Sequence, residues 1–522
     1  MTASRETETR PEGSRAPVRL GVAAGAVTVG VSELLAGFML RAGWSRGTPS
    51  PLDAVGAVFV DLTPAWLKDA AIGLFGTADK LALFVGILVV LAILSGLIGL
   101  LAARSRVAGL AAVALLVVVA MAAVLARPNS GILDLVPVLV GGAVGARLLW
   151  GWCRPILQAP TERGEQLEPA PGLSRRAVLG VALGGAAMTV LGRITAGGTR
   201  VVELARAAFR LPPVAAPVTV PAGVEVGVPG VTPFIVPNKE FYRIDTALTV
   251  PKIDPAEWSL KVTGLVEREL TLDWETLLSK PMQEAMVTLM CVSNEVGGSL
   301  NGNAIWTGWP VRELLREAGV RPGADMVLSR SSDGFTAGTP LEALTDDRNA
   351  LLVVAQNREP LLPEHGFPVR LVVPGLYGYV SATKWVTELK VTRFADDQGY
   401  WTPRGWSALG PVKTNSRIDV PSSGARLGAG TVAVAGVAWA QHRGIIGVQV
   451  SVDGGPWTDT RLGTDATVDA WRQWAYTWPA TPGRHTIAVR AIDATGTPET
   501  AARALPAPDG ASGHHTITVT VA

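Results

Sequence analysis

The sequence predicts a multi-domain protein with an α-helical transmembrane anchor of about five spans, an α+β domain and a C-terminal immunoglobulin-like β-sandwich. Three observations indicate this organisation. Apolar residues concentrate in the first 200 of 522 positions, prolines crowd the segment that follows, and strand-like apolar runs fill about the last 110. With 48% hydrophobic and 17% charged residues, the chain is too apolar to be soluble throughout.

The N-terminal apolar runs approach or exceed the roughly 20 residues that a helix needs to cross a bilayer. After a cytoplasmic tail at 1–17, the anchor at 18–200 is expected to contain spans at 18–40, 81–103, 107–126, 132–152 and 177–197. Arginines gather before the first span, between the second and third, and between the fourth and fifth. Because positive residues favour the cytoplasmic side, this multi-pass anchor would lie in the cell membrane with the remaining domains on the extracytoplasmic side.

Three features of the spans bear on function. Glu33 is an acidic residue inside the first proposed span, and a glutamate that faces a neighbouring helix is favoured over a proton or lipid role. None of the five histidines falls in a span, so we expect no haem between paired transmembrane histidines. The last span opens with Arg175 and Arg176, which fit either the positive-charge rule or a twin-arginine export signal.

The segment at 201–231 is expected to be a linker, because seven prolines between 211 and 237 favour extended chain. An α+β domain should follow at 232–410, with a helix over 310–318 that begins at Pro310 and stops before Gly319.

The last domain should occupy 411–522. Strand-like runs there are separated by Gly, Pro and Asp, the pattern of a sandwich, and they lie at 431–439, 445–455, 485–493 and 515–521. A net charge of +2 gives no reason to expect a nucleic-acid partner.

Cys291 is one of two cysteines, and it stands between an apolar strand and a polar, glycine-rich loop. The other, Cys153, is expected on the opposite side of the membrane, so the two cannot pair within one chain. The residue alone leaves three interpretations open: a small buried hydrophobe, a nucleophile with His365 as its base, or a thiolate ligand of a metal.

The residues around Cys291 resemble the sulfite oxidase family of molybdopterin-dependent oxidoreductases. The resemblance covers about 235–522 and rests on blocks at 288–294, 302–308, 365–374, 383–385 and 238–245. It implies a molybdopterin cofactor whose metal is bound by Cys291, a catalytic residue, and a C-terminal domain that forms homodimers. A domain that folds around this cofactor in the cytoplasm needs export in the folded state, which favours the twin-arginine interpretation of Arg175 and Arg176.

The resemblance also implies roles for other residues. Arg370 and Lys384 would bind the cofactor phosphate with charge-assisted hydrogen bonds. Arg243 would contact both the cofactor and the substrate anion, as a second catalytic residue. Further cofactor contacts would come from Asn238, Tyr242, His365 and Thr383.

The implied reaction is transfer of an oxygen atom to or from a small sulfur oxyanion, a sulfoxide or a similar small molecule. With no haem-attachment sequence in the anchor, electrons would pass to a separate redox partner, a cytochrome or a quinone-linked protein. Sulfite-oxidising members carry arginines just beyond the metal cysteine, whereas 292–300 contains neither Arg nor Lys here. A reductase of neutral sulfoxides therefore stays open.

Two alternatives from other classes remain at this point. One is a non-enzymatic membrane protein that displays an immunoglobulin-like interaction module, which leaves the blocks around Cys291 and Arg370 unexplained. The other is a cysteine hydrolase that uses Cys291 and His365.

Overall fold

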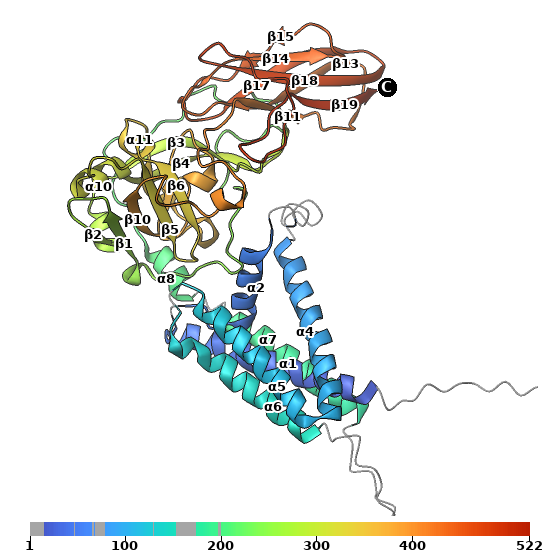
Figure 1. Ribbon diagram of the computed structural model, residues 1–522. Helices are drawn as coiled ribbons and strands as arrows, with labels where there is room; N and C mark the ends of the chain where they lie inside the picture. The colour runs from blue at the N-terminus through green and yellow to red at the C-terminus, as the bar shows by residue number, and fades with distance from the viewer. Residues whose placement is uncertain are drawn as a thin grey trace, which may run out of the picture. The chain divides into compact units, whose positions relative to one another are not determined.

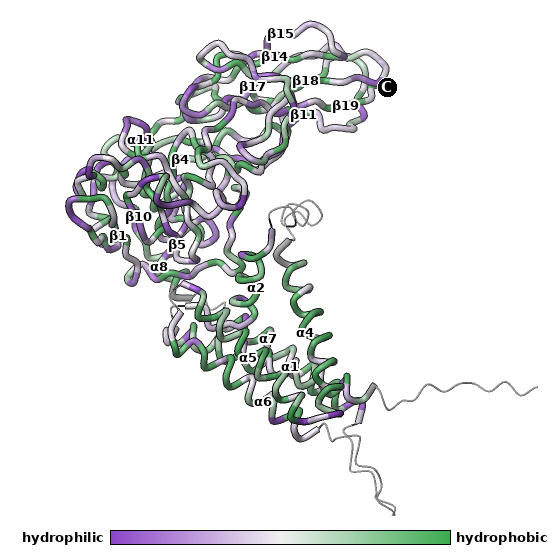
Figure 2. The backbone as a smooth tube through the Cα atoms, viewed as in Figure 1, coloured by the Kyte–Doolittle hydropathy of each residue, from purple (hydrophilic) through white to green (hydrophobic). Residues whose placement is uncertain are grey.

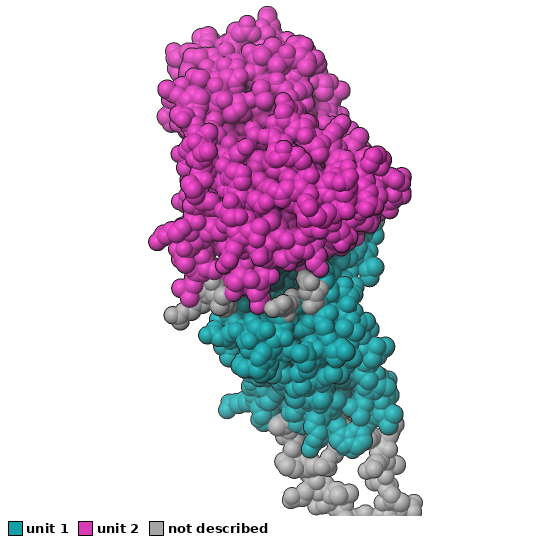
Figure 3. All heavy atoms as spheres, turned by 90° about the vertical axis from the view of Figure 1, so that its left-hand side faces the viewer, with its two compact units in different colours: residues 1–200, 247–249 teal, residues 201–246, 250–522 magenta. Residues whose placement is uncertain are grey.

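The computed structural model describes residues 15–45, 47–64, 67, 79–128, 130–152, 174–196 and 200–522. The chain divides into two compact units, coloured separately in Figure 3. Unit 1 contains Met1–Arg200 and Ala247–Thr249, and unit 2 contains Val201–Thr246 and Val250–Ala522. Cys153 lies outside the described residues.

Unit 1 is a bundle of apolar helices (Figures 1 and 2). Among the described residues, five helical segments are long and apolar enough to cross a membrane, and they match the five predicted spans: Ala16–Arg41, Ala82–Arg104, Arg106–Leu125, Ile132–Trp152 and Arg175–Ala196. The helices are α1 (Arg15–Arg41), α2 (Pro51–Leu62), α4 (Asp79–Arg104), α5 (Arg106–Leu125), the 3₁₀-helix η3 (Ile132–Leu135), α6 (Val136–Trp152) and α7 (Arg175–Ala196). The short α2, which starts with a Ser50 cap, was not expected.

Glycines let α1 and α7 approach each other closely. A Cβ atom on Gly30 would lie 2.3 Å from the Gly185 carbonyl oxygen, and one on Gly192 would lie 2.3 Å from the Glu33 carbonyl oxygen. Small residues at such positions allow backbone-to-backbone packing between membrane helices. The first and last helices of the anchor are therefore packed against each other.

Glu33 faces neighbouring helices, as expected, and its side chain is only 2% exposed. Its carboxylate accepts hydrogen bonds from Ser50 Oγ at 2.7 Å and from the Leu52 amide at 3.2 Å. Arg193 of α7 lies 3.4 Å from the same carboxylate and also pairs with Asp53 of α2 at 2.9 Å. The pairs join α1, α2 and α7, and they satisfy charges that would otherwise be costly in an apolar bundle.

The first half of unit 2 is an α+β domain with two sheets. One has the strand order β2-β1-β10-β5-β6, and the other has the order β3-β4-β7-β8 with β9 paired to β7. The strands are β1 (Ser259–Gly264), β2 (Leu270–Asp273), β3 (Gln283–Met290), β4 (Asn301–Pro310), β5 (Met326–Ser331), β6 (Thr336–Pro340), β7 (Leu351–Gln356), β8 (Glu359–Pro360), β9 (Arg370–Val372) and β10 (Val386–Thr392). The helices are α8 (Arg200–Ala208), α9 (Trp274–Leu278), α10 (Val311–Ala318) and α11 (Glu342–Thr345), with 3₁₀-helices η4 (Pro255–Glu257), η5 (Pro363–His365), η6 (Gly378–Val380) and η7 (Thr402–Arg404).

Helix α10 confirms the helix predicted over 310–318. Pro310 is its N-cap residue, and Gly319 ends it in the left-handed conformation with a φ of 70°. Glycine tolerates that backbone conformation without the steric penalty that a Cβ atom brings.

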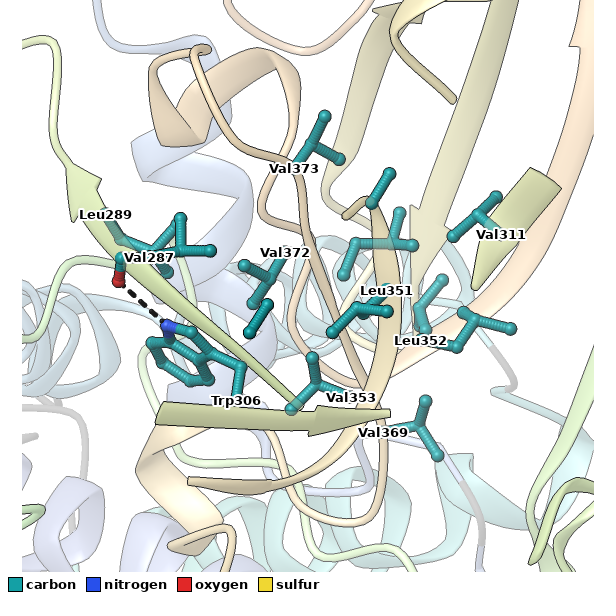
Figure 4. Close-up of a cluster of buried hydrophobic side chains, with 14 of the residues drawn as sticks. Val287, Leu289, Trp306, Val311, Leu351, Leu352, Val353, Val369, Val372 and Val373 are labelled. Carbon is teal, nitrogen blue, oxygen red and sulfur yellow. Dashed lines mark hydrogen bonds between the residues drawn. The ribbon is translucent and has the colours of Figure 1, made fainter. Parts of the chain in front are cut away.

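The core of this half lies around β3, β4, β7 and β9 (Figure 4). Every residue of β4 is buried, as are the last six residues of β3, so the strand before Cys291 has apolar neighbours on both faces. Trp306 is fully buried, and its indole Nε1 donates to the Val287 carbonyl oxygen at 3.0 Å. A strand covered on both faces explains why this stretch is apolar without alternation.

The second half of unit 2 is built from two sheets, with the orders β11-β13-β17-β16 and β12-β19-β18-β14-β15. Their strands are β11 (Asn415–Val420), β12 (Arg426–Leu427), β13 (Gly430–Trp439), β14 (Ile445–Val452), β15 (Thr458–Asp459), β16 (Arg461–Leu462), β17 (Arg472–Ala480), β18 (Gly483–Asp493) and β19 (His515–Val521). Both sheets contribute to one core that includes Val434, Trp474 and Ile487. The four predicted strand runs coincide with β13, β14, β18 and β19, while an immunoglobulin-like topology stays a prediction.

The proline-rich segment does not behave as a free spacer. Helix α8 occupies its start, and further along the Val218 amide donates to Glu284 Oε2 at 2.8 Å. The Val226 amide donates to Gln473 Oε1 at 2.8 Å, so the same segment also contacts the sandwich. The expected linker at 201–231 is therefore packed against both halves of unit 2, and the boundaries expected at 232 and 411 stay predictions.

The packing of α1 against α7 gives a testable prediction. In Gly185→Leu the new Cβ would lie 2.5 Å from the backbone of Ala26, so the variant should lose about 1–3 kcal/mol of stability and unfold at a lower temperature in detergent. Gly184→Leu is the matched control, since a Cβ there has no described atom within 4 Å. Equal unfolding temperatures of the two variants would show that the close contact at Gly185 does not determine how α1 and α7 pack.

Candidate active site

Cys291 directly follows β3, and the loop 292–300 leads from it into β4. The two strands are antiparallel with a continuous register from Gln283↔Gly308 to Met290↔Asn301. The Cys291 amide donates to the Leu300 carbonyl at 2.9 Å, and the Cys291 carbonyl accepts from the Asn294 amide at 3.1 Å. Cys291 is 8% exposed and makes no disulfide within the described residues. A hydrogen-bonded pair of strands thus presents a buried thiol.

The nucleophile interpretation finds no support in this geometry. Burial raises the pKa of the Cys291 thiol, although hydrogen bonds with Ser293 oppose the shift. His365 Nε2 bonds to the Asn238 carbonyl oxygen at 3.1 Å instead of to the thiol. Burial, followed by the charges of Arg370 and Lys384, lowers the pKa of His365 to about 3. A general base works best with a pKa near the working pH, so His365 is poorly suited to deprotonate Cys291.

His365 and Asn238 form one side of the site. Because a carbonyl only accepts, His365 Nε2 carries the proton and Nδ1 is left as an acceptor. Asn238 itself donates to the Gln356 carbonyl and to Glu359 Oε2, both at 3.0 Å. The sequence analysis identified both residues, and the structure places them in direct contact.

Arg370 is more deeply buried than the other two predicted site cations, Arg243 and Lys384, with 6% exposure. Its Nη1 donates to the His365 carbonyl oxygen at 3.0 Å, and its guanidinium carbon lies 5.1 Å from the centre of the Trp306 ring. Burial lowers the pKa of Arg370 to about 10, with the nearby Tyr242 opposing the shift. Among the described residues, Arg370 Nε has no hydrogen-bond partner. A buried charge with an unused donor fits a site that receives an anion.

Tyr242 connects Arg370 electrostatically with the thiol. Burial raises the pKa of the Tyr242 hydroxyl, the proximity of Cys291 raises it further, and Arg370 lowers it. These electrostatic interactions indicate that Tyr242 lies near both Cys291 and Arg370.

A second cationic pair centres on Asp245, which the sequence analysis did not identify. Lys384 Nζ donates to Asp245 Oδ2 at 2.7 Å and to the Glu364 carbonyl oxygen at 2.9 Å. Arg243 Nε donates to the same Asp245 oxygen at 2.8 Å. Burial lowers the pKa of Lys384 to about 8, and Asp245 opposes this shift. The sequence signal that could have identified Asp245 is its place two residues after Arg243, where a carboxylate can pair with the arginine.

Thr383 stands apart from this network. Its hydroxyl is buried and lies 2.7 Å from Ser329 Oγ, while its carbonyl accepts from the Leu371 amide at 2.9 Å. These contacts fix the backbone next to Lys384. The structure thus places Thr383 next to Lys384 in the chain, with its hydroxyl bonded to Ser329.

The residues present fit a molybdopterin. A buried thiol suits a soft, high-valent metal, and the guanidinium and ammonium groups of Arg370, Lys384 and Arg243 suit a phosphate and other anionic groups. The unused Arg370 Nε is the observation that most directly indicates a missing anionic partner.

Comparisons with known proteins agree with this chemistry. The family model described as "Oxidoreductase molybdopterin binding domain" matches residues 247–401. The uncharacterized oxidoreductase YuiH of Bacillus subtilis is 34% identical over 165 residues, which cover 32% of this chain and 80% of YuiH. The mitochondrial sulfite oxidase of Drosophila melanogaster is 30% identical over 269 residues, 42% of this chain and 46% of that protein.

Among solved structures, the sulfane dehydrogenase SoxCD from Paracoccus pantotrophus aligns with a TM-score of 0.49 and 24% identity, over 59% of this chain and 87% of that chain. The present chain spans less than half the length of the fly sulfite oxidase that it matches.

The Asp245 pair predicts a pH dependence of cofactor retention. A lysine is charged below its pKa. Asp245→Asn removes the neighbouring negative charge and should therefore lower the pKa of Lys384 below about 8. As the pH rises, Lys384 should then lose its charge, and its hold on a phosphate, at a lower pH than in the wild type. Pterin fluorescence after gel filtration should fall more between pH 6.5 and 8.5 in this variant than in the wild type. The exposed Asp347→Asn is the control, and parallel pterin loss in all three proteins would contradict the role of Asp245.

Proposed function

This chain belongs to the sulfite oxidase family of molybdopterin-binding oxidoreductases, and from that premise we propose that it transfers an oxygen atom to or from a small sulfur oxyanion, sulfoxide or similar molecule on the extracytoplasmic side of the cell membrane. The observation that carries the proposal is a buried Cys291 thiol together with a buried, incompletely bonded Arg370, both of which interact electrostatically with Tyr242. A buried cation with an unused donor is costly, and a bound anionic cofactor would reduce that cost.

The chain's own groups have distinct roles in this proposal. Cys291 would be the protein ligand of the molybdenum, and the bound cofactor would supply oxygen-atom exchange and storage of two electrons. Arg370 and Lys384 would hold the cofactor phosphate, with Asp245 fixing the position of the Lys384 ammonium. His365, neutral because of its low pKa, offers Nδ1 as an acceptor.

Arg243 and Tyr242 are the residues proposed nearest to the substrate. Arg243 is exposed, and its Nε is held by Asp245, which leaves the two Nη atoms to meet an anion. Tyr242 shares the neighbourhood of the thiol and of Arg370. Asn238 and Thr383 would complete the cofactor site. Asn238 would orient His365 through the hydrogen bond at its carbonyl, and Thr383 would fix the backbone next to Lys384.

Reduction of a neutral sulfoxide is the second candidate reaction. The loop 292–300, which follows Cys291, contains no Arg or Lys that would concentrate a doubly charged anion. The non-enzymatic display hypothesis is wrong, since the chain belongs to an enzyme family.

The anchor and the partners are part of the proposal. Five helices of sufficient length and hydropathy support a multi-pass anchor, and Arg175 and Arg176 at the start of α7 are proposed as a twin-arginine export signal. The two-sheet C-terminal domain is proposed to be immunoglobulin-like and to mediate a homodimer. An anchor without haem and a separate cytochrome or quinone-linked redox partner remain predictions.

Metal content tests the proposal directly. Protein purified in detergent should contain close to one molybdenum per chain. Cys291→Ser should lower activity by more than about 100-fold, beyond the 10–100-fold that outer-shell changes cause. Cys153→Ser is the matched control and should change neither quantity. The proposal fails if the wild type contains no molybdenum in cells that load another molybdoenzyme.

Export provides a separate test. Replacement of Arg175 and Arg176 by lysine should leave the distal domain in the cytoplasm, because the twin-arginine pathway reads the arginine pair and not merely its charge. Protease treatment of spheroplasts then should not cleave the domain. The corresponding Arg104 and Arg106 double lysine variant should be exported normally, and normal export of both variants would contradict the signal.

A further inference from the structure

The loop 292–300 makes few hydrogen bonds of its own. Asn294 Oδ1 accepts from the Leu300 amide at 2.7 Å, and the Gly298 amide donates to the Glu295 carbonyl at 2.9 Å. Two of its residues, Gly297 and Gly298, add backbone freedom. Such a loop needs contacts from elsewhere to hold one conformation.

Arg417, in β11 of the sandwich, supplies such contacts. Its Nη1 donates to the Gly298 carbonyl oxygen at 2.7 Å and to Asn301 Oδ1 at 2.9 Å, where β4 begins. Its Nε donates to Asp419 at 2.6 Å, and its Nη2 donates to Thr232 Oγ1 at 3.0 Å. Arg417 is 5% exposed, so these charge-assisted bonds are shielded from water and correspondingly strong.

His515, at the start of β19, holds the neighbouring glycine. A Cβ atom on Gly297 would lie 2.4 Å from His515 Cδ2 and Nε2, so the imidazole packs directly against the loop backbone. His515 Nδ1 accepts from the Ile418 amide at 3.0 Å, which orients the ring from within the sandwich.

The sandwich also binds the strand that leads to Cys291. The Thr288 amide donates to the Asp469 carbonyl at 2.9 Å, and Thr288 Oγ1 accepts from the Trp471 amide at 2.8 Å. Gln441 Nε2 donates to the Thr288 carbonyl at 3.0 Å. Strand β3, which precedes Cys291, and the loop 292–300, which follows it, are therefore both bonded to residues of the C-terminal sandwich.

We propose that the C-terminal sandwich is part of the catalytic unit, and that Arg417 is a positioning residue which sets the conformation of the loop 292–300 beside Cys291. The proposal rests on the proposed function for the role of Cys291. It gives the sandwich a task within a single chain, separate from any dimer contact. The Arg417 guanidinium is bonded to the loop backbone, so in this proposal it positions the loop and does not bind the substrate.

Arg417→Met is the test variant, because methionine keeps an unbranched side chain like the aliphatic part of arginine and removes all the hydrogen-bond donors. The molybdenum content should stay near the wild-type value, while KM for the substrate rises about tenfold or more and the Mo(V) electron paramagnetic resonance signal shifts, since small displacements near a reacting centre cost up to about 100-fold. Amide hydrogen exchange of peptides from 292–300 should be at least about tenfold faster. This last readout does not require bound molybdenum.

Arg461→Met is the matched control. Arg461 also reaches from the sandwich to a backbone carbonyl, that of Val226 at 2.7 Å, but it does not touch the loop. Hydrogen exchange in 292–300 and KM should be unchanged in this variant. If Arg417→Met does not accumulate, Arg417→Lys keeps a charge beside Asp419 and should give an intermediate increase in loop exchange.

The outcomes separate the two proposals. Unchanged loop exchange in Arg417→Met, or an equal increase in Arg461→Met, overturns the positioning role whatever the metal content. Faster loop exchange with unchanged KM and an unchanged Mo(V) signal overturns its link to catalysis. A wild type without molybdenum overturns the proposed function, and the exchange comparison then still decides whether Arg417 holds the loop.

Discussion

The register between β3 and β4 is the constraint on which the site depends. Side chains alternate between the two faces of a strand, so a slip of one residue would turn Cys291 to the opposite face. Burial of both strands makes such a slip expensive, because it would displace Trp306 and its neighbours from a close-packed core. The thiol is therefore located by hydrophobic packing before any polar contact of the site is considered.

Desolvation is the second organising effect. Arg370 and Lys384 are both buried, and burial lowers the pKa of each. The carboxylate of Asp245 compensates Lys384 and Arg243, whereas within the described part of the chain Arg370 contacts a carbonyl oxygen and an aromatic face. A positive excess is built into the fold, and the fold tolerates it because the group that binds there is anionic. Burial and the positive charges of Arg370 and Lys384 also lower the pKa of His365, which keeps this histidine neutral.

Much of this could be predicted from the sequence, because the strongest signals are local. Continuous hydropathy located the five long helices, and Pro310 with Gly319 located α10. The blocks around Cys291 and Arg370 indicated the family. Long-range contacts were not predictable. Arg417 and Gly298 lie 119 positions apart, and a proline-rich composition does not reveal that Val218 and Val226 are bonded to folded partners. Helix α2 was missed because 12 residues are too few for a span.

The glycine contact between α1 and α7 has a consequence for biosynthesis. Gly30 and Gly185 are 155 positions apart, so at 5–20 residues per second α1 emerges on the order of ten seconds before its partner. During that interval the small-residue face of α1 lacks the helix that covers it in the folded bundle. The bundle is complete only when α7, which begins with Arg175 and Arg176, has been synthesised. If Arg175 and Arg176 act as the proposed export signal, the helix that completes the bundle also directs the distal domain to export.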